Sequence, residues 1–460
     1  MPDKYDVVVI GAGVAGCGVA AILQQSGKKV ALIDRYNQVG GRAMTWPYKD
    51  GWTIDIGLHE VELGPFSKCH QLAERVGGTI EWGEWSGGIG VYNGNGKWSD
   101  LGEMLKMGKQ EIEDYKKIIK TVASMTDEEI DQWDDKDWKL WLDGQSGSKV
   151  VKDMFAIIGM INTTVLEPEN MSAGENLYIM RENLRYTRQA LQASYPRGGM
   201  RALTDPVVEA FKKAGGALML NTTVKEVIVK DKQVRGVALA KTVAPYPAPW
   251  NFPDREIIEA DRVVCALPIW DLEKVIPMDP RFSFMPEWWT KRINDIKLET
   301  TCLIGYLAGF SEPLFPDCQF KTALNLERTK TPFQAFSPSN MMQGIAPEGK
   351  FLLHCDIPVE VPSVQDPFEL QFYLDAMWEE MKEMWPGMED KLEWRIPYYT
   401  LGCDGLARKP MHTGRFKPDI KAPGIDGLYF AGDTYRGRGL ALNGAANSGM
   451  LCADLILSEK

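Results

Sequence analysis

The sequence predicts an α/β fold, in which a Rossmann-like dinucleotide-binding domain is joined to a second domain of mixed helices and strands. Three glycine-rich stretches predict it: VVVIGAGVAGCGVAAILQQSGKKVALIDR, YPRGGMRALTDPVVEAF and GLYFAGDTYRGRGLALNGAAN. In each of them, glycines stand beside a predicted helix, where the backbone can approach phosphate groups closely. With 460 residues, the chain is long enough for two or three domains.

The first stretch has the pattern of a strand, a tight turn, a helix and a second strand. A Val-rich run over residues 5–10 predicts a buried parallel strand, and the following helix is expected to end near Gly27. The second strand should end at Asp34. This order of elements is the context that a dinucleotide-binding fingerprint requires.

The glycines of this turn follow the spacing G-x-G-x-x-G at Gly11, Gly13 and Gly16. Gly11 should form the tight turn, Gly13 should let the pyrophosphate approach, and Gly16 should let the helix pack on the strand. Ala15 lies in the first turn of the helix, whose free N–H groups and dipole favour a negative charge. We therefore expect a dinucleotide pyrophosphate at this helix N-terminus.

An acidic residue follows at the distance that the fingerprint predicts. Asp34 lies 18 positions after Gly16, close to the usual ~20, where a carboxylate accepts a hydrogen bond from a ribose hydroxyl. We expect Arg35 beside it to contact the cofactor as well.

The segments IDRYNQVGGRAMTW and GWTIDIGLHEV, which come next, help to identify the dinucleotide that is bound. This arrangement resembles the flavoprotein family that includes phytoene desaturases, amine oxidases and protoporphyrinogen oxidases. The resemblance implies that Gly41 and Arg42 pack against the FAD pyrophosphate, since a guanidinium can fork onto phosphate oxygens. It also implies that Gly57 and Leu58 lie near the flavin.

The middle and final stretches complete the predicted cofactor domain. Residues 197–200 should open a helix that runs to about residue 214, followed by the strands ALMLNTTVKEVIVK and QVRGVAL. By resemblance, Val224 would meet the adenine side. Gly432 and Asp433 would contact the flavin ribityl and pyrophosphate, and a helix starting near Leu440 and Ala441 would direct its N-terminus at the isoalloxazine.

The resemblance thus implies a Rossmann-like FAD-binding domain of the glutathione-reductase and amine-oxidase type, discontinuous in sequence, plus an α+β substrate-binding domain. We assign residues 1–70, 195–275 and 425–460 to the first domain, and residues 71–194 and 276–424 to the second. We expect FAD to be bound non-covalently, although Cys403 stands near the place where monoamine oxidases link their flavin.

Four residues are candidates for catalysis beside the flavin, which itself carries the redox chemistry. His59 and Glu60 follow a glycine turn that the family places near the ring, and a histidine there could shuttle a proton. Lys297 should open a strand comparable to the one that carries a lysine in amine oxidases. Tyr399 stands in a segment where amine oxidases place an aromatic residue.

The resemblance leaves several functions open. The segment GLAL, residues 439–442, stands where amine oxidases carry an opposing aromatic residue, so a dehydrogenase, desaturase or oxidase acting on an apolar substrate, such as a cyclic or polyene one, is favoured. A flavin amine oxidase is the first alternative, and a redox-neutral flavin-dependent isomerase or a non-enzymatic prenyl-protein escort is the second. Dioxygen, a quinone or a carrier protein could accept the electrons.

Composition excludes other classes. A net charge of −11 argues against nucleic-acid binding. The absence of a long apolar run or a signal-peptide pattern predicts a cytoplasmic protein with no transmembrane segment, although FMPEWWTKRI could contact a membrane surface. Eight scattered cysteines predict no metal site, and the acidic run TDEEIDQWDDKDWK predicts a solvated helix face. Assembly into a homo-oligomer stays open.

Overall fold

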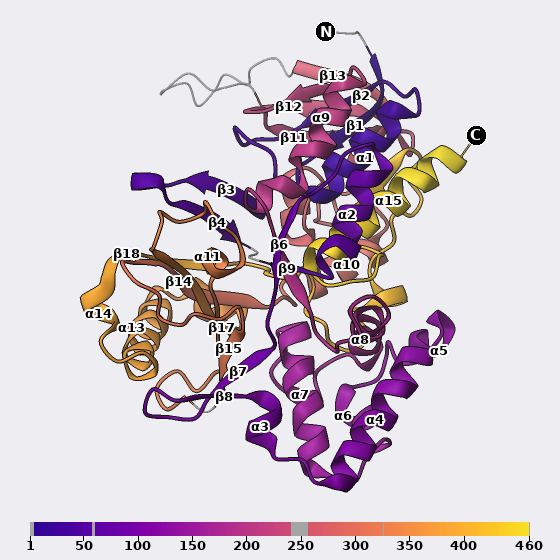
Figure 1. Cartoon of the computed structure of the whole chain (residues 1–460). Coiled ribbons are helices and arrows are strands. Elements are labelled where there is room, and N and C mark those ends of the chain that lie inside the picture. The colour runs from indigo at the N-terminus through magenta and orange to yellow at the C-terminus, as the bar shows by residue number, and fades with distance from the viewer. Residues whose placement is uncertain (1–3, 58–59, 241–255, 325, 460) are drawn as a thin grey trace.

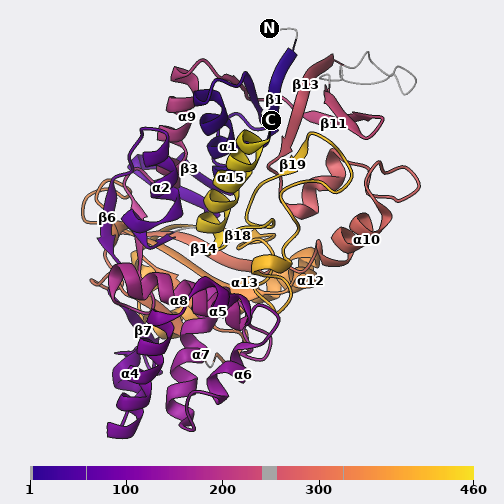
Figure 2. The ribbon, with the colours of Figure 1, turned by 90° about the vertical axis from the view of Figure 1, so that its right-hand side faces the viewer.

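A computed structural model describes residues 4–57, 60–240, 256–324 and 326–459. It has three parts, which Figure 1 shows as an upper α/β part, an antiparallel sheet at the lower left and a group of helices at the lower right. Figure 2 shows that the helices α1 and α15 lie side by side against the upper part. The predicted α/β class is confirmed.

The upper sheet takes strands from three separate segments of the chain. Its order is β10–β2–β1–β13–β12–β11, with β19 also paired to β13; β1, β2, β10, β13 and β19 run parallel, while β11 and β12 are antiparallel. The bounds are β1 (Lys4–Ile10), β2 (Val30–Ile33), β10 (Ala217–Met219), β11 (Val224–Lys230), β12 (Gln233–Leu239), β13 (Glu256–Cys265) and β19 (Leu428–Phe430). The domain limits themselves stay a prediction.

Both faces of this sheet are covered, because successive side chains of a strand point to opposite sides. Val7 and Val9 pack in a core with α1 (Val14–Gln25), α2 (Lys68–Arg75), α9 (Asp205–Lys213) and α15 (Ala441–Ser458). Val8 and Ile10 pack in a second core that includes Trp289 of α10 (Glu287–Ile296). The Val-rich run is buried on both sides, as a parallel strand should be.

Two details of the middle stretch differ from the prediction. The expected helix over residues 197–214 is a 3-10 turn (Met200–Leu203) followed by α9, because Pro206 lies in the first turn of α9 and a proline cannot continue a preceding helical turn. The expected single strand ALMLNTTVKEVIVK is divided into β10 and β11, since Asn221 has a left-handed backbone with φ 51°.

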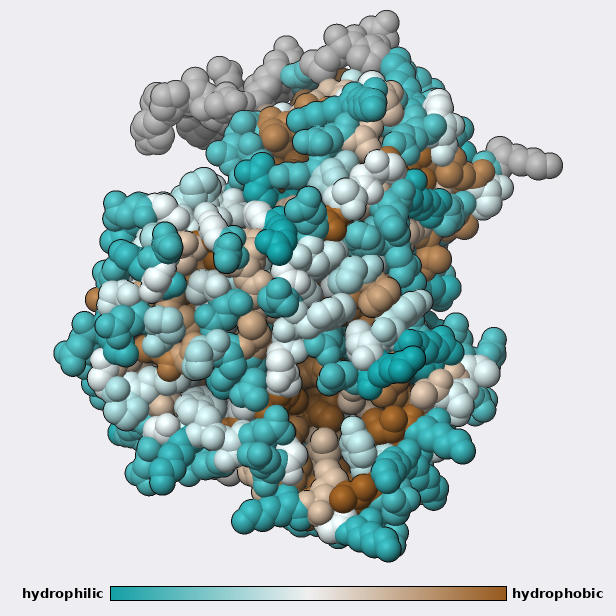
Figure 3. All heavy atoms as spheres, in the orientation of Figure 1, coloured by the Kyte–Doolittle hydropathy of each residue, from teal (hydrophilic) through white to brown (hydrophobic). Residues whose placement is uncertain are grey.

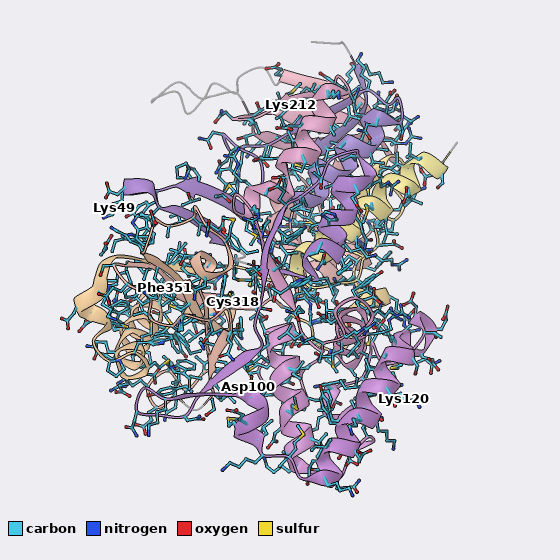
Figure 4. The ribbon with its side chains drawn as sticks, in the orientation of Figure 1. Lys49, Asp100, Lys120, Lys212, Cys318 and Phe351 are labelled. Atoms are coloured by element: carbon cyan, nitrogen blue, oxygen red, sulfur yellow. The ribbon has the colours of Figure 1, made fainter. Side chains whose placement is uncertain are left out.

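The lower-left part is a sheet in the order β18–β14–β17–β16–β15–β7–β8, in which only the described pair β15–β7 is parallel. The strands β7 and β8 form an antiparallel hairpin at one edge of this sheet. Figure 4 marks Phe351, which is fully buried within this sheet on β17. The bounds are β7 (Ile89–Tyr92), β8 (Trp98–Asp100), β14 (Cys302–Phe310), β15 (Phe320–Ala323), β16 (Phe333–Phe336), β17 (Phe351–Val359) and β18 (Leu392–Thr400).

Short strands and helices surround this sheet. The helix α13 packs against it through Met377 and Met381. The remaining bounds here are β3 (Ala43–Pro47), β4 (Thr53–Gly57), β5 (Val61–Glu62), β6 (Trp82–Trp85), β9 (Ala193–Pro196), α11 (Pro338–Met341), α12 (Val361–Gln365), α13 (Pro367–Met384) and α14 (Met388–Lys391). The hairpin β3–β4 and the sheet β5–β9–β6 connect the upper and lower parts.

The lower-right part is helical, and its surface carries both charged and apolar residues. Lys120 of α4 points outward here, as Lys212 does on α9 (Figure 4). Figure 3 shows apolar residues gathered in a hollow between these helices and the antiparallel sheet. The bounds are α3 (Leu101–Leu105), α4 (Lys109–Ser124), α5 (Asp127–Asp131), α6 (Trp138–Asp143), α7 (Lys149–Thr163) and α8 (Ala173–Thr187).

The acidic run is exposed at Asp127, Glu128, Glu129 and Asp135, as a solvated face should be, but Asp134 departs from the prediction. Asp134 is fully buried, and its carboxylate lies 2.8 Å from the Arg438 guanidinium. Asp131 pairs with the same guanidinium, and Asp127 pairs with Arg181. The distant arginines could not be recognised as partners from the local sequence. Among the described helices, none is both long and apolar enough to cross a bilayer.

Candidate functional site

A cavity of about 460 Å³, which we call the glycine-lined cavity, opens where β1, β2 and β13 end. Backbone forms much of its wall, at Gly11, Gly13, Gly40 and Gly41. The carboxyl ends of parallel strands are the usual binding edge of an open α/β sheet. The cavity is therefore the candidate cofactor site.

The three fingerprint glycines meet different surroundings. A Cβ atom on Gly16 would lie 1.9 Å from the Gly11 carbonyl oxygen, and one on Gly11 would lie 2.7 Å from the Ala266 carbonyl oxygen. A Cβ atom on Gly13 would have no atom closer than 4.0 Å. Gly11 and Gly16 are thus required by packing, whereas the space beside Gly13 is open for a ligand.

Two helix N-termini face this cavity. Val14 and Ala15 of α1 line it, and so do Ala441 and Leu442 of α15. Neither helix has a side-chain cap or an acidic residue in its first turn. Free N–H groups and the positive ends of two helix dipoles therefore meet one cavity, which suits an anionic ligand.

One end of the cavity is lined by Asp34, Arg35 and residues 222–224, which include Val224. The Asp34 carboxylate accepts hydrogen bonds from the backbone N–H groups of Ala12 at 2.7 Å and Tyr36 at 2.9 Å. These bonds fix the carboxylate at the cavity wall. Each of its oxygens can still accept a bond from a ligand hydroxyl.

The other end is lined by Arg42, Gly432 and Asp433. The Arg42 Nη2 group donates to both carboxylate oxygens of Asp433, at 2.5 and 2.6 Å, and Nη1 donates to the Gly402 carbonyl oxygen at 2.5 Å. It also stacks 5.3 Å from the centre of the Trp270 ring. Residues from three distant segments thus fix this guanidinium.

A second cavity of about 290 Å³, which we call the aliphatic cavity, adjoins the first at Gly41, Arg42 and Leu401, which line both. Strands β4, β14 and β18 supply its side chains. The aliphatic members are Ile54, Ile56, Leu307, Ile396 and Leu401, and Tyr398, Tyr399, Thr400, Gly402 and Cys403 complete one wall. Burial raises the pKa of the Cys403 thiol well above its ordinary value.

Asp55 is the carboxylate among the described residues that line the aliphatic cavity. It is fully buried, and it accepts hydrogen bonds from Thr45 Oγ1 at 2.5 Å, from the Met200 N–H at 3.0 Å and from the Tyr195 hydroxyl. The Asp55 carboxylate thus has hydrogen-bond partners within the protein itself. It holds the hairpin β3–β4 against the middle stretch of the chain.

Of the catalytic candidates that the structure describes, Tyr399 is the one that it places at the wall of either cavity. Tyr399 lines the aliphatic cavity and is 54% exposed. Glu60 lines neither cavity; burial raises the pKa of its carboxyl to about 7, and its Oε2 has no hydrogen-bond partner among the described residues. Leu58 and His59 lie outside the described residues.

The expectation that Lys297 opens a strand is wrong. Lys297 is the C-cap residue of α10, and its ammonium pairs with Glu273 at 2.7 Å; neither residue lines either cavity. The strand β14 begins only at Cys302, because the chain turns through residues 297–300 first.

Two further cofactor candidates lie at the margin of the site. Gly57 ends β4 opposite Ala43, and Leu440 is the N-cap residue of α15 but does not line the glycine-lined cavity. Trp270, Asp55 and the aliphatic side chains of the second cavity were not among the predicted site residues. Only Asp55 gave a local signal, as a charged residue within an apolar strand pattern.

The fold and the adjoining cavities define a dinucleotide-dependent oxidoreductase architecture. The sequence profile described as "Flavin containing amine oxidoreductase" matches residues 98–457, and that described as "NAD(P)-binding Rossmann-like domain" matches residues 9–75. The chain belongs to the flavin-containing amine oxidoreductase family and is a flavin-dependent oxidoreductase.

Curated relatives include phytoene desaturases. The 15-cis-phytoene desaturase of Capsicum annuum is 23% identical over 100% of this chain and 79% of its own length. That of Synechococcus elongatus is 23% identical over 59% of this chain and 59% of its own length. The chain therefore spans less than two thirds of the cyanobacterial relative.

Solved structures share the fold. An oxidoreductase from Methanosarcina mazei has a TM-score of 0.77 at 18% identity, covering 97% of this chain and 99% of its own. A putrescine oxidase bound to putrescine has a TM-score of 0.65 at 16% identity, covering 99% of both chains.

Proposed function

We propose that this chain is an FAD-dependent oxidoreductase that transfers a hydride between the flavin and a largely apolar substrate held in the aliphatic cavity. The observation that carries this proposal is the shared wall of Gly41, Arg42 and Leu401, which joins a cavity suited to a dinucleotide to one lined by aliphatic side chains. FAD, when bound, supplies a hydride acceptor or donor at N5.

The residues of the glycine-lined cavity fit FAD in type and order. The α1 N-terminus and the space beside Gly13 suit the pyrophosphate, and Asp34 suits a ribose hydroxyl of the adenosine half. Arg42, Asp433 and the α15 N-terminus suit the flavin half. The positive helix end would favour negative charge on the reduced ring.

The aliphatic cavity favours an apolar substrate over an amine. An alkylammonium ion is held by an accessible carboxylate or by facing aromatic rings, but Asp55 is fully buried and already accepts three internal hydrogen bonds. Tyr398 and Tyr399 are neighbours on one strand and therefore cannot form two opposing walls. A polyene or cyclic hydrocarbon skeleton would instead bury its surface against the isoleucines and leucines.

The test is an anaerobic substrate screen followed by flavin absorbance. We expect the purified protein to be yellow, and its absorbance to bleach with a carotenoid, terpenoid or cyclic ketone but not with putrescine or a primary amine. If only reduced flavin reacts, the same screen is run after dithionite reduction, with unsaturated substrates as oxidants.

Bleaching by amines alone would establish the amine-oxidase alternative instead. A protein that cannot be loaded with FAD would contradict the proposal altogether. Reoxidation of the reduced protein by dioxygen, by a soluble quinone or by a carrier protein, measured separately, identifies the electron acceptor.

A further inference from the structure

The glycine-rich turn before α15 is held by charged side chains that the proposed function does not use. The Gly439 carbonyl oxygen accepts from Arg408 Nη2 at 3.4 Å, and the Gly439 N–H donates to Glu175 Oε1 at 3.3 Å. The Gly437 carbonyl oxygen accepts from Lys417 Nζ at 3.3 Å. We call Glu175, Arg408 and Lys417 the turn clamp.

The turn clamp is buried and comes from separate segments of the chain. Glu175 has no exposed surface, Arg408 is 2% exposed and Lys417 is 4% exposed. The Arg408 guanidinium lies 3.8 Å from Glu175 and 3.6 Å from Asp404. Charges at such depth are costly unless they are paired, so a buried cluster at this turn requires an explanation.

The turn also carries its own anchor. The Arg438 guanidinium lies 2.8 Å from the buried Asp134 carboxylate, in the acidic run that was expected to be solvated. It lies 3.6 Å from Glu175 as well. The helical part of the molecule thus holds this turn through Glu175 of α8 and through Asp134, which follows α5.

The backbone of the turn adopts conformations that need such support. Gly437 and Gly439 have φ values of 153° and 113°, and Ala441, which is not a glycine, has a φ of 39°. A left-handed alanine persists only where its surroundings fix it. Ala441 is the first residue of α15 and lines the glycine-lined cavity.

We propose that the turn clamp is a positioning device for the flavin. It fixes residues 437–439 so that the first turn of α15 presents its free N–H groups to the flavin end of the glycine-lined cavity. Glu175, Arg408 and Lys417 are positioning residues, since none of them lines that cavity. This inference rests on the proposed FAD site.

A charge-neutral double variant, Arg408→Met/Glu175→Met, tests this role. It removes one positive and one negative group, so a changed flavin potential cannot come from net charge. We expect FAD affinity of the apoprotein to fall about tenfold. We also expect the two-electron equilibrium to shift about tenfold toward oxidised flavin, which corresponds to ~30 mV.

The matched control is Lys321→Met/Asp317→Asn, which removes a partly buried ion pair from the antiparallel sheet, at residues that line neither cavity. We expect a comparable loss of thermal stability but wild-type FAD affinity and potential. A clamp variant with wild-type affinity and potential would overturn the inference. A wild-type protein that takes up no FAD would instead contradict the proposed function.

If the double variant does not fold, a second variant tests the positioning role of Glu175. Glu175→Gln retains an acceptor oxygen for the Gly439 N–H but loses the charge. We expect the FAD dissociation constant and the two-electron equilibrium constant of the flavin each to stay within about twofold of the wild-type value. A tenfold shift toward reduced flavin would show that Glu175 acts as a through-space charge, and the positioning role would be wrong.

Discussion

The two adjoining cavities are built in different ways. The glycine-lined cavity takes its wall from backbone turns and two helix N-termini, so its chemistry depends on a few glycines at fixed spacing. The aliphatic cavity takes its wall from single side chains on β4, β14 and β18. The glycine-lined cavity is specified by local sequence patterns, and the aliphatic cavity only by the packing of separate strands. Substitutions of comparable size should therefore have different consequences in the two cavities.

The largest effect is expected at the turn beside the first cavity, from the same substitution at two glycines of that turn. Gly16→Val should reduce the free energy of unfolding by about 3 kcal/mol or more, because its Cβ would lie 1.9 Å from a backbone oxygen. Gly13→Val should change the stability of the apoprotein by less than about 1 kcal/mol but abolish FAD uptake. Urea unfolding and flavin content measure both.

A Gly13→Val protein that binds FAD normally would contradict the assignment of this cavity. A Gly16→Val protein as stable as wild type would show that α1 can move away from its turn. The wall of the glycine-lined cavity would then not depend on glycines at fixed spacing.

A substitution in the aliphatic cavity should affect turnover alone. Ile56 is 44% exposed and lines this cavity, so Ile56→Glu should change stability by no more than about 0.5 kcal/mol. With an apolar substrate, kcat/KM should fall at least about tenfold, since a charge would face the hydrocarbon surface. The control Ile257→Glu, at a 54% exposed isoleucine of β13 that lines neither cavity, should have wild-type turnover.

Glu62 of β5 lines neither cavity, and its burial predicts a pH dependence of stability. Its backbone carbonyl oxygen accepts from Asn443 of α15 at 3.0 Å, and burial raises the pKa of its carboxyl to about 8 from 4.5. The protonated form is favoured in the folded state. The resulting stability is therefore fully present below pH 4.5 and is lost as the pH rises through 8.

Glu62→Gln removes this dependence while its amide oxygen can still accept the hydrogen bond of Asn183. The stability of the variant relative to wild type should rise with pH between 5 and 8, by at most about 1.4 kcal/mol per pH unit. Unfolding by urea at pH 5, 7 and 9 checks this. Parallel curves for the two proteins would show that the Glu62 carboxyl titrates normally.

The smallest effect is expected from Lys297→Ala. Its ion pair with Glu273 is partly exposed, with side-chain exposures of 27% and 54%, so stability should change by less than about 1 kcal/mol. The rate of anaerobic flavin reduction should equal that of wild type. A tenfold slower reduction would restore Lys297 as a catalytic candidate. It would also show that the C-terminal end of α10 affects the flavin.

The sequence by itself determined the backbone features of the cofactor site. The strand from residue 4, the turn at Gly11–Gly16, the acid at Asp34 and the helix at Ala441 all depend on neighbouring residues, because tight turns and helix N-termini are local structures. A resemblance carried by such features was sufficient to identify the flavoprotein family.

Only the tertiary structure decided what surrounds that site. It directed Lys297 to the surface, gave Arg42 its partners Gly402 and Asp433, and placed Asp134 in the core against Arg438. The partners of Arg42 are about 360–391 positions away in sequence, and the local pattern contains no record of them. Long-range ion pairs and a cavity assembled from separate strands follow from packing, which a single sequence read locally does not specify.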